Sequence, residues 1–374
     1  MIYLDNAATS KFKPKCALKA FEREFLDSAN GGRSGHRDAV NTALRISLAR
    51  TFLCNIFNGN EIIFTKNCTE ALNIVILGSL KEGGHVITTV NEHNSVLRPL
   101  FKLERDKKIK LSVINPDTNL AINPNHLERL IGRDTYMVVV NAASNVTGAQ
   151  ADLEKIGKIC AEKNIMLVVD GAQAVPHASI DVKALHINYL ACPGHKGLHG
   201  PQGTGFLVLN DERKLQPLLY GGTGTNSDSV YQPFALPEAL EAGTLNAAGI
   251  YSLGEASKWT YKNISKIRRH IESINETVLY GLKNMNSLEV YTPDGTKNGV
   301  VAFNIKNKTS MEVGDILNEK YNIAVRSGLH CAPLIHNHLG TLDRGIVRAS
   351  IGFNNTEKDA YCLLKAVEEI IANK

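Results

Sequence analysis

One lysine, Lys196, stands between a histidine and a run of glycines in the segment 191–206. It follows Asp170 by 26 residues. Glycines at 194, 197 and 200 loosen the backbone around it, so its amine can swing onto a carbonyl and form a Schiff base. The same amine can leave again when a substrate amine displaces it. This arrangement predicts a site for pyridoxal 5'-phosphate (PLP).

PLP requires a carboxylate for its ring nitrogen, an aromatic or imidazole plane over its ring, and N–H groups for its phosphate. Asp170 follows an apolar run and can supply the carboxylate. Asn67, Cys68 and Thr69 lie where a helix is predicted to begin at Thr69, and the free N–H groups and the hydroxyl there can bind a phosphate. A simple helix cap is the alternative reading of Thr69.

A second reactive segment is RSGLHC at 326–331. Cys331 beside His330 and near Arg326 has surroundings that favour a thiolate nucleophile. Two alternatives remain open, namely a buried structural cysteine and a metal site formed by Cys331, His336 and His338, although their spacing is not a standard zinc pattern. Arg348 is either a solvated strand residue or a bidentate clamp for a carboxylate.

The elements that must position these side chains alternate between strands and helices. Short apolar runs at 61–65, 85–89, 110–114, 136–140, 166–170 and 205–209 predict strands, and helical patterns such as 153–163 lie between several of them. This alternation predicts a mostly parallel α/β sheet. Polar residues fall just after these strands, where a ligand crevice forms. They are Glu92, His93, Asn145, Asp170 and Gln173.

The C-terminal third has a different pattern. Isoleucines recur on one stripe of a long amphipathic helix from about residue 264 to 282. Strands are predicted at 300–305 and 323–326, and a last helix begins at Glu357 with Thr356 and Asp359 as its cap. We therefore expect a large domain followed by a smaller one.

Composition bounds the function. The chain has 374 residues, 43% of them hydrophobic, and a formal net charge of +5. Its basic clusters are short and separated, and no basic stripe with interleaved aromatics is present, so we expect no nucleic-acid binding. No apolar run reaches the roughly 20 residues of a membrane span, and no leader pattern is visible, which predicts a cytoplasmic protein. The seven cysteines are scattered without a CxxC pair, which argues against a disulfide framework.

Taken together, the motifs resemble the cysteine desulfurases, in the class V branch of the fold-type I PLP enzymes. The match runs nearly end to end and in order. It comprises LDNAAT (4–9), TEALN (69–73), EHN (92–94), SNVTG (144–148), DGAQAV (170–175), GHK (194–196), EAGTLN (241–246), RSGLHC (326–331) and RAS (348–350).

The resemblance implies a fold and a division of the chain. We expect a seven-stranded, mostly parallel sheet in a large PLP-binding domain at 15–260. The smaller α+β domain would comprise 1–14 and 261–374 and carry the cysteine loop. Homodimerisation is implied as well.

The resemblance also implies roles for individual residues. Lys196 would be the Schiff-base lysine and Cys331 the nucleophile, while His93 would stack on the cofactor ring. The remaining roles are Asp170 on the ring nitrogen, Gln173 on the ring hydroxyl, Thr69, Cys68, His195 and the second subunit's Thr244 around the phosphate, and Asn145, Arg348 and Arg326 on the substrate. No metal is implied. Pro193 departs from the pattern, because many relatives have a phosphate-donating serine or threonine there and proline has no N–H.

The implied activity converts L-cysteine to L-alanine and passes sulfur through a Cys331 persulfide to an acceptor protein. Such sulfur mobilisation serves routes such as iron–sulfur cluster assembly. The alternatives are a selenocysteine lyase, acting on L-selenocysteine, or another class V enzyme such as an aminotransferase. Cys331 distinguishes desulfuration from transamination, because desulfuration needs its thiol and transamination does not.

Overall fold

The computed structural model describes residues 1–32 and 34–372. The helices are α1 (Lys15–Asp27), α2 (Arg37–Phe57), α3 (Cys68–Gly78), α4 (Asn94–Arg105), α5 (Pro124–Leu130), α6 (Leu153–Glu162), α7 (Ala247–Lys262), α8 (Ile264–Lys283), α9 (Ser310–Tyr321), α10 (Pro333–His338) and α11 (Glu357–Ala372). The strands are β1 (Ile2–Tyr3), β2 (Glu61–Thr65), β3 (His85–Thr89), β4 (Lys110–Ile114), β5 (Thr135–Asn141), β6 (Met166–Asp170), β7 (Tyr189–Pro193), β8 (Gly205–Leu209), β9 (Leu288–Val290), β10 (Val300–Ile305), β11 (Ile323–Ala324) and β12 (Val347–Ser350).

A seven-stranded sheet organises the first two thirds of the chain, in the order β2-β8-β7-β6-β5-β3-β4. Strands β4, β3, β5, β6 and β7 are parallel to one another, whereas β8 pairs antiparallel with both β7 and β2. The predicted mostly parallel α/β sheet is therefore confirmed. In register, Asn141 at the end of β5 lies beside Asp170 at the end of β6, so polar residues gather at one edge of the sheet.

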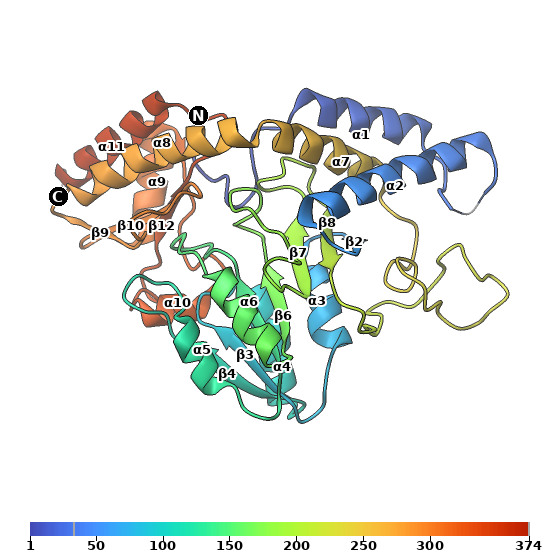
Figure 1. The fold of residues 1–374 in the computed structure, drawn as a ribbon. Coiled ribbons are helices and arrows are strands. Elements are labelled where there is room, and N and C mark those ends of the chain that lie inside the picture. The colour runs from blue at the N-terminus through green and yellow to red at the C-terminus, as the bar shows by residue number, and fades with distance from the viewer. Residues whose placement is uncertain (33, 373–374) are drawn as a thin grey trace.

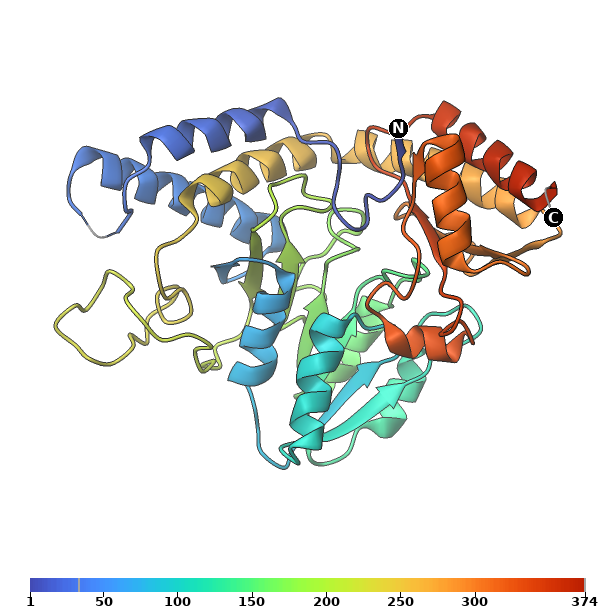
Figure 2. The ribbon, with the colours of Figure 1, turned by 180° about the vertical axis from the view of Figure 1, so that it is seen from behind.

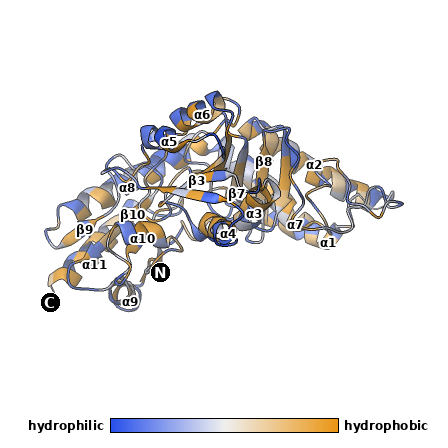
Figure 3. Ribbon diagram, turned by 90° about the horizontal axis from the view of Figure 1, so that it is seen from below, coloured by the Kyte–Doolittle hydropathy of each residue, from blue (hydrophilic) through white to orange (hydrophobic). Residues whose placement is uncertain are grey.

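The central strands are apolar on both faces because helices cover both (Figures 1 and 2). Val138, Val140, Leu167 and Val169 pack in one core together with residues of α2, α6 and α7. The alternate side chains form a second core with α3 and α4. In Figure 3 the central strands are largely orange while the covering helices carry both colours, as amphipathic helices should.

A separate hydrophobic core lies in the C-terminal region. It joins α8, α9 and α11 to the antiparallel sheet β12-β10-β9. Leu4 belongs to this core, and β1 pairs in parallel with β11. The first residues of the chain therefore pack with its last third, and the segment from residue 5 to 14 runs back toward the large sheet.

The long segment between β8 and α7 extends away from the body of the protein (Figure 1, olive). Several of its large apolar side chains are exposed, including Val230 at 93% and Phe234 at 83%. No helix within residues 1–32 and 34–372 is long and apolar enough to cross a membrane.

Candidate active site

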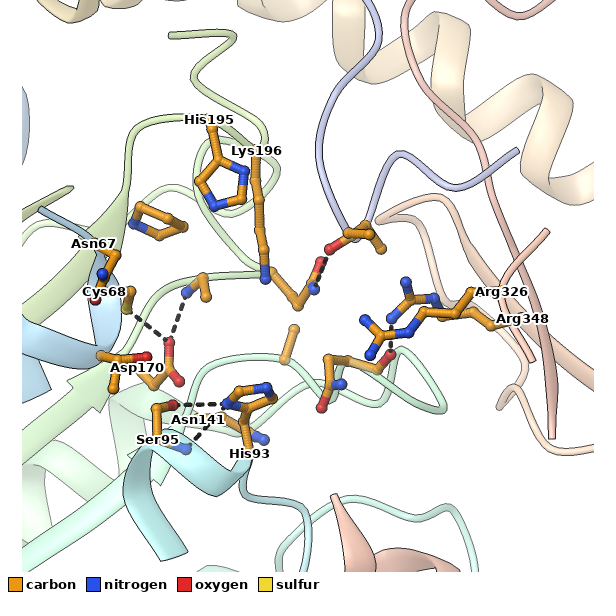
Figure 4. Close-up of a pocket in the computed structure, with 18 residues that line it drawn as sticks. Asn67, Cys68, His93, Ser95, Asn141, Asp170, His195, Lys196, Arg326 and Arg348 are labelled. Carbon is orange, nitrogen blue, oxygen red and sulfur yellow. Dashed lines mark hydrogen bonds between the residues drawn. The ribbon is translucent and has the colours of Figure 1, made fainter. Parts of the chain in front are cut away.

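A cavity of about 240 Å³ opens at the carboxyl edge of the large sheet. It is lined by residues from the ends of β5, β6 and β7, from the start of α3, and from the N-terminal segment. Arg326 and Arg348 line it from the C-terminal region, so the large sheet and the C-terminal region both contribute to the cavity (Figure 4).

Lys196 reaches the cavity from the turn that follows β7. Burial lowers the pKa of its amine, and the negative charge of Asp170 opposes this shift. Gly197 keeps the turn close to the rest of the domain, because a β-carbon there would overlap the carbonyl of Val175 and the ring of Pro176. The lysine is therefore partly desolvated and held on a tightly packed turn.

Asp170 presents one carboxylate oxygen to the chain and one to the cavity. Its Oδ1 accepts a hydrogen bond from the Ala172 N–H at 2.9 Å and a weaker one from the Cys68 thiol at 3.6 Å. Its Oδ2 makes no hydrogen bond within the described residues. This free oxygen is available to the nitrogen of a bound heterocycle.

His93 is held in one orientation by its own helix. As the N-cap of α4, its Nδ1 accepts a hydrogen bond from the Ser95 N–H at 3.0 Å and lies 2.9 Å from Ser95 Oγ (Figure 4). Burial lowers the pKa of the ring. A neutral imidazole whose Nδ1 is an acceptor carries its proton on Nε2.

An anion subsite lies where α3 begins. Asn67 caps the helix by accepting from the Glu70 N–H at 2.9 Å, which leaves the N–H groups of Cys68 and Thr69 without intrahelical partners. The helix begins at Cys68, one residue before the predicted start. His195 also lines the cavity, and its buried Nδ1 has no hydrogen-bond partner in the described chain. Burial, aided by Lys196 and Lys13, lowers its pKa to about 4.

Arg348 is fully buried, so its reading as a solvated strand residue is wrong. It donates from Nη1 to the Asn145 carbonyl at 2.8 Å and from Nη2 to Asp5 Oδ1 at 2.9 Å. Burial lowers its pKa to about 10 against the opposing effect of Asp5. Its Nε and the Asn145 Oδ1 are both buried without partners in the described chain. One hydrogen-bond donor and one acceptor are therefore available to a ligand.

Cys331 is exposed, which excludes its reading as a buried structural cysteine. It is not among the residues that line the cavity, but its Sγ lies 3.8 Å from Nη2 of Arg326, which does. Its carbonyl accepts from the Asn94 N–H at 2.7 Å, directly after His93. His330 and Cys331 both have left-handed backbone angles, with φ of 50° and 57°. Such conformations are costly for these residue types and often occur at functional loops.

The metal alternative is not supported. His336 is buried and directs Nδ1 to Thr341 Oγ1 at 2.8 Å, whereas Cys331 and His338 are exposed. Among residues 1–32 and 34–372, no three histidine, cysteine, aspartate or glutamate side chains are grouped as a metal site would require.

Two further predicted residues differ in their placement. Gln173 lines the cavity and donates from Nε2 to the Ala7 carbonyl at 2.9 Å. Thr244 is exposed and does not line the cavity of its own chain. The cavity of one chain therefore holds Lys196, Asp170, Gln173, His93, Thr69, Cys68, His195, Asn145, Arg326 and Arg348, but neither Thr244 nor Cys331.

Three supporting residues have roles that the sequence does not predict. Asp5 pairs with Arg348, and Ser95 orients His93. Asp5 lies within the LDNAAT motif and Ser95 directly follows the EHN motif. Glu92, although noted after its strand, was given no role. Its side chain is 0% exposed and its Oε1 accepts from Thr89 Oγ1 at 2.6 Å and from the Asn141 N–H at 2.9 Å.

Comparison with known proteins gives consistent matches over the whole chain. The family model described as aminotransferase class-V matches residues 2–363. A probable cysteine desulfurase of Methanothermobacter thermautotrophicus is 33% identical over 99% of this chain and 94% of its own length. One from Pyrococcus abyssi is 34% identical, with the same coverage.

Solved structures agree with these relatives. An apo cysteine desulfurase from Thermococcus onnurineus superposes with a TM-score of 0.92 and 32% identity, covering 100% of this chain and 95% of that one. A cysteine desulfurase from Escherichia coli has a TM-score of 0.88 and 27% identity over 99% of this chain and 94% of that one.

Proposed function

The chain belongs to the aminotransferase class-V family, and on that premise we propose that it is a PLP-dependent cysteine desulfurase that converts L-cysteine to L-alanine. One observation carries the proposal. Lys196, Asp170 and Arg348 meet in a single cavity, and an exposed Cys331 lies beside it next to Arg326. Two curated relatives that match nearly the whole chain bear the same activity in their names.

The unpartnered polar atoms of the cavity fit PLP. Asp170 Oδ2 suits the ring nitrogen, while the first N–H groups of α3, the Thr69 hydroxyl and His195 Nδ1 suit the phosphate. His93 and Gln173 would contact the ring. Pro193 lines the same end and offers no donor, so His195 and α3 carry more of the phosphate binding.

When bound, PLP supplies an electron sink for the pair left at the substrate α-carbon once its proton departs. The lowered pKa of Lys196 increases the fraction of its amine that is neutral, and the neutral amine is the form that attacks a carbonyl and accepts that α-proton. Asp170 Oδ2 would accept a hydrogen bond from the ring nitrogen, and its carboxylate would favour the protonated form of that nitrogen. Arg348 Nε and the second N–H of Asn145 Nδ2, whose first N–H donates to the His330 carbonyl, would hold the substrate carboxylate, with Arg326 at the same end of the cavity.

Cys331 takes the sulfur. Its thiolate attacks the substrate sulfur, a new S–S bond forms, and the bond from that sulfur to carbon breaks, with its electron pair returning to the carbon skeleton that becomes alanine after protonation. Arg326, 3.8 Å from the Cys331 sulfur, places positive charge beside the attacking group. The resulting persulfide is exposed, which suits transfer to an acceptor protein.

The test measures L-alanine released from L-cysteine and from L-selenocysteine, with reductant present to clear persulfide. Cys331→Ala should abolish release from L-cysteine, and Lys196→Ala should abolish release from both substrates. Cys362→Ala, in α11, is the matched thiol control and should behave as wild type. Alanine from selenocysteine alone, or full activity of Cys331→Ala on cysteine, would contradict the proposal in favour of a lyase or another class V reaction.

We further propose a homodimer. The apolar side chains of the β8–α7 segment are too exposed for a monomer surface, and Thr244 is free to reach a second copy's phosphate. The separate hydrophobic cores support a division into 15–260 and 1–14 plus 261–374. All seven cysteines are free thiols, which supports a cytoplasmic location.

A further inference from the structure

One backbone carbonyl beside the catalytic lysine receives an unusual number of donors. The oxygen of His195 accepts from the Ser10 N–H at 3.1 Å, Ser10 Oγ at 3.0 Å, Lys13 Nζ at 3.1 Å and Thr9 Oγ1 at 3.4 Å. All four come from the segment 9–13, which we call the N-terminal strap. A carbonyl oxygen has two lone pairs, so this acceptor is more than saturated.

This carbonyl belongs to the peptide group that joins His195 to Lys196. Both side chains line the cavity, so one set of hydrogen bonds fixes the backbone from which both project. The other side of the turn is fixed as well, because the His199 N–H donates to the Lys196 carbonyl at 2.9 Å and the Gly200 N–H to the Gly194 carbonyl at 2.8 Å.

Lys13 is the charged side chain among the strap's four donors to this carbonyl, and it has no acidic partner among the described residues. Its ammonium lies 2.8 Å from Ser10 Oγ and 3.1 Å from the His195 oxygen, and no ion pair of Lys13 occurs among the described residues. Burial lowers its pKa to about 8. A half-buried ammonium without a carboxylate costs desolvation energy. The hydrogen bonds from Lys13 to Ser10 Oγ and to the His195 carbonyl offset that cost. A charge-assisted bond of this kind is stronger than a neutral one.

We propose that Lys13 is a positioning residue for Lys196, acting by a charge-assisted hydrogen bond that fixes the 195–196 peptide. Lys13 does not line the cavity. The catalytic consequence rests on the proposed PLP function, whereas the restraint on the turn does not. With PLP bound, Lys196 would have to move between the cofactor carbonyl and the substrate α-proton, and both positions of its amine depend on a fixed Cα.

The experiment compares Lys13→Met, which keeps the aliphatic stem, with Lys13→Arg, which keeps a charged donor. Ser10→Ala is a second, milder way to weaken the strap, and Lys15→Met is the control, since Lys15 is exposed at the start of α1. Hydrogen exchange of the amides at 196–200 is followed by mass spectrometry. On PLP-loaded enzyme, the fraction of cofactor that borohydride fixes to Lys196 is measured together with kcat and KM for L-cysteine.

Lys13→Met should speed exchange at 196–200 by on the order of tenfold, lower the fraction fixed by borohydride, and reduce kcat by about tenfold with little change in KM. Lys13→Arg should restore all three, and Ser10→Ala should shift them in the same direction as Lys13→Met. If exchange at 196–200 equals that of Lys15→Met, the proposal is wrong, whether or not the protein binds PLP. If the wild type takes up no PLP and Lys13→Met still exchanges faster at 196–200, the proposed function is refuted but the restraint on the turn stands.

Discussion

Replacing Glu92 with glutamine tests the electrostatics behind the candidate site. Glu92 is fully buried directly before His93, and its Oε2 has no partner among the described residues. Burial is the largest cause that raises its pKa to about 8, while hydrogen bonds from Thr89 and Asn141 oppose the rise and the charge of Asp170 adds to it. Glutamine keeps the shape and can accept the same two hydrogen bonds, but it never ionises.

The sign follows from proton counting. Below about pH 4.5 the carboxyl is protonated in both the folded and the unfolded chain, so the wild type suffers no ionisation cost. Between that pH and about 8, the unfolded chain releases the proton and the folded chain keeps it, so the free energy of unfolding falls as pH rises. A pKa of about 8 in place of 4.5, at ~1.4 kcal/mol per pH unit, corresponds to a loss of ~5 kcal/mol, fully developed above pH 8.

The assay is urea unfolding of the cofactor-free wild type and Glu92→Gln between pH 5 and 9. Transitions followed by circular dichroism and by fluorescence of the single tryptophan, Trp259, must coincide before free energies are compared. The variant should gain stability relative to wild type steadily from pH 5 to 8, by up to ~4 kcal/mol over this window of three pH units. Glu104→Gln, on the exposed side of α4, should show no such trend. A difference between Glu92→Gln and wild type that stays flat over this range would refute the reasoning.

Three further outcomes are expected. Arg348→Lys should raise KM for L-cysteine by roughly tenfold, because a single ammonium cannot keep the hydrogen bonds to Asn145 and Asp5 and also offer a donor in place of Nε; an unchanged KM in steady-state kinetics would place the substrate carboxylate elsewhere. Ser95→Ala should lower kcat by about tenfold at constant thermal stability, because it removes the hydroxyl beside His93 Nδ1, and a pH–rate profile identical to wild type would exclude that role. Phe234→Glu should shift the protein toward monomer in analytical ultracentrifugation, since Phe234 is 83% exposed on the β8–α7 segment; an unaltered dimer would move the interface away from that segment.

Much of the large domain could be predicted because its strands are buried on both faces. Runs such as 85–89 and 166–170 are short, apolar and rich in β-branched residues, and the structure has strands at those bounds. The sequence does not predict strand β7, because Tyr189–Pro193 includes an alanine, a cysteine and a proline and merges into the glycine-rich lysine turn. Helix α7 was missed for a related reason, because glycines and serines at its buried positions weaken the helical pattern. Close packing against α1 and α2 compensates for that weak propensity.

The site residues were predictable in kind but not in their pairings. The glycines around Lys196 and the apolar strand before Asp170 indicate the roles of these two residues locally. The partner of Arg348, in contrast, lies 343 residues away in the chain. Nothing in the local sequence around Asp5 states that its carboxylate will face a guanidinium. Thr356 and Asp359 show the contrast, since their reciprocal cap at α11 is a local motif and forms as predicted.

The same long-range contacts explain why the N-terminal segment matters to the site. Leu4 is buried in the C-terminal core, Asp5 neutralises Arg348 at the substrate end, and Ser10 and Lys13 hold the peptide that carries Lys196. Ten residues of chain therefore join the C-terminal core to both ends of the cavity. A shift of one core relative to the other would displace Arg348 from Lys196, and the strap opposes that shift because its hydrogen bonds are made to a turn that is already packed on both sides. The geometry of the site thus depends on how the C-terminal core joins the large sheet. The contacts that make this junction, Asp5 with Arg348 and Lys13 with His195, link residues that are far apart in the sequence.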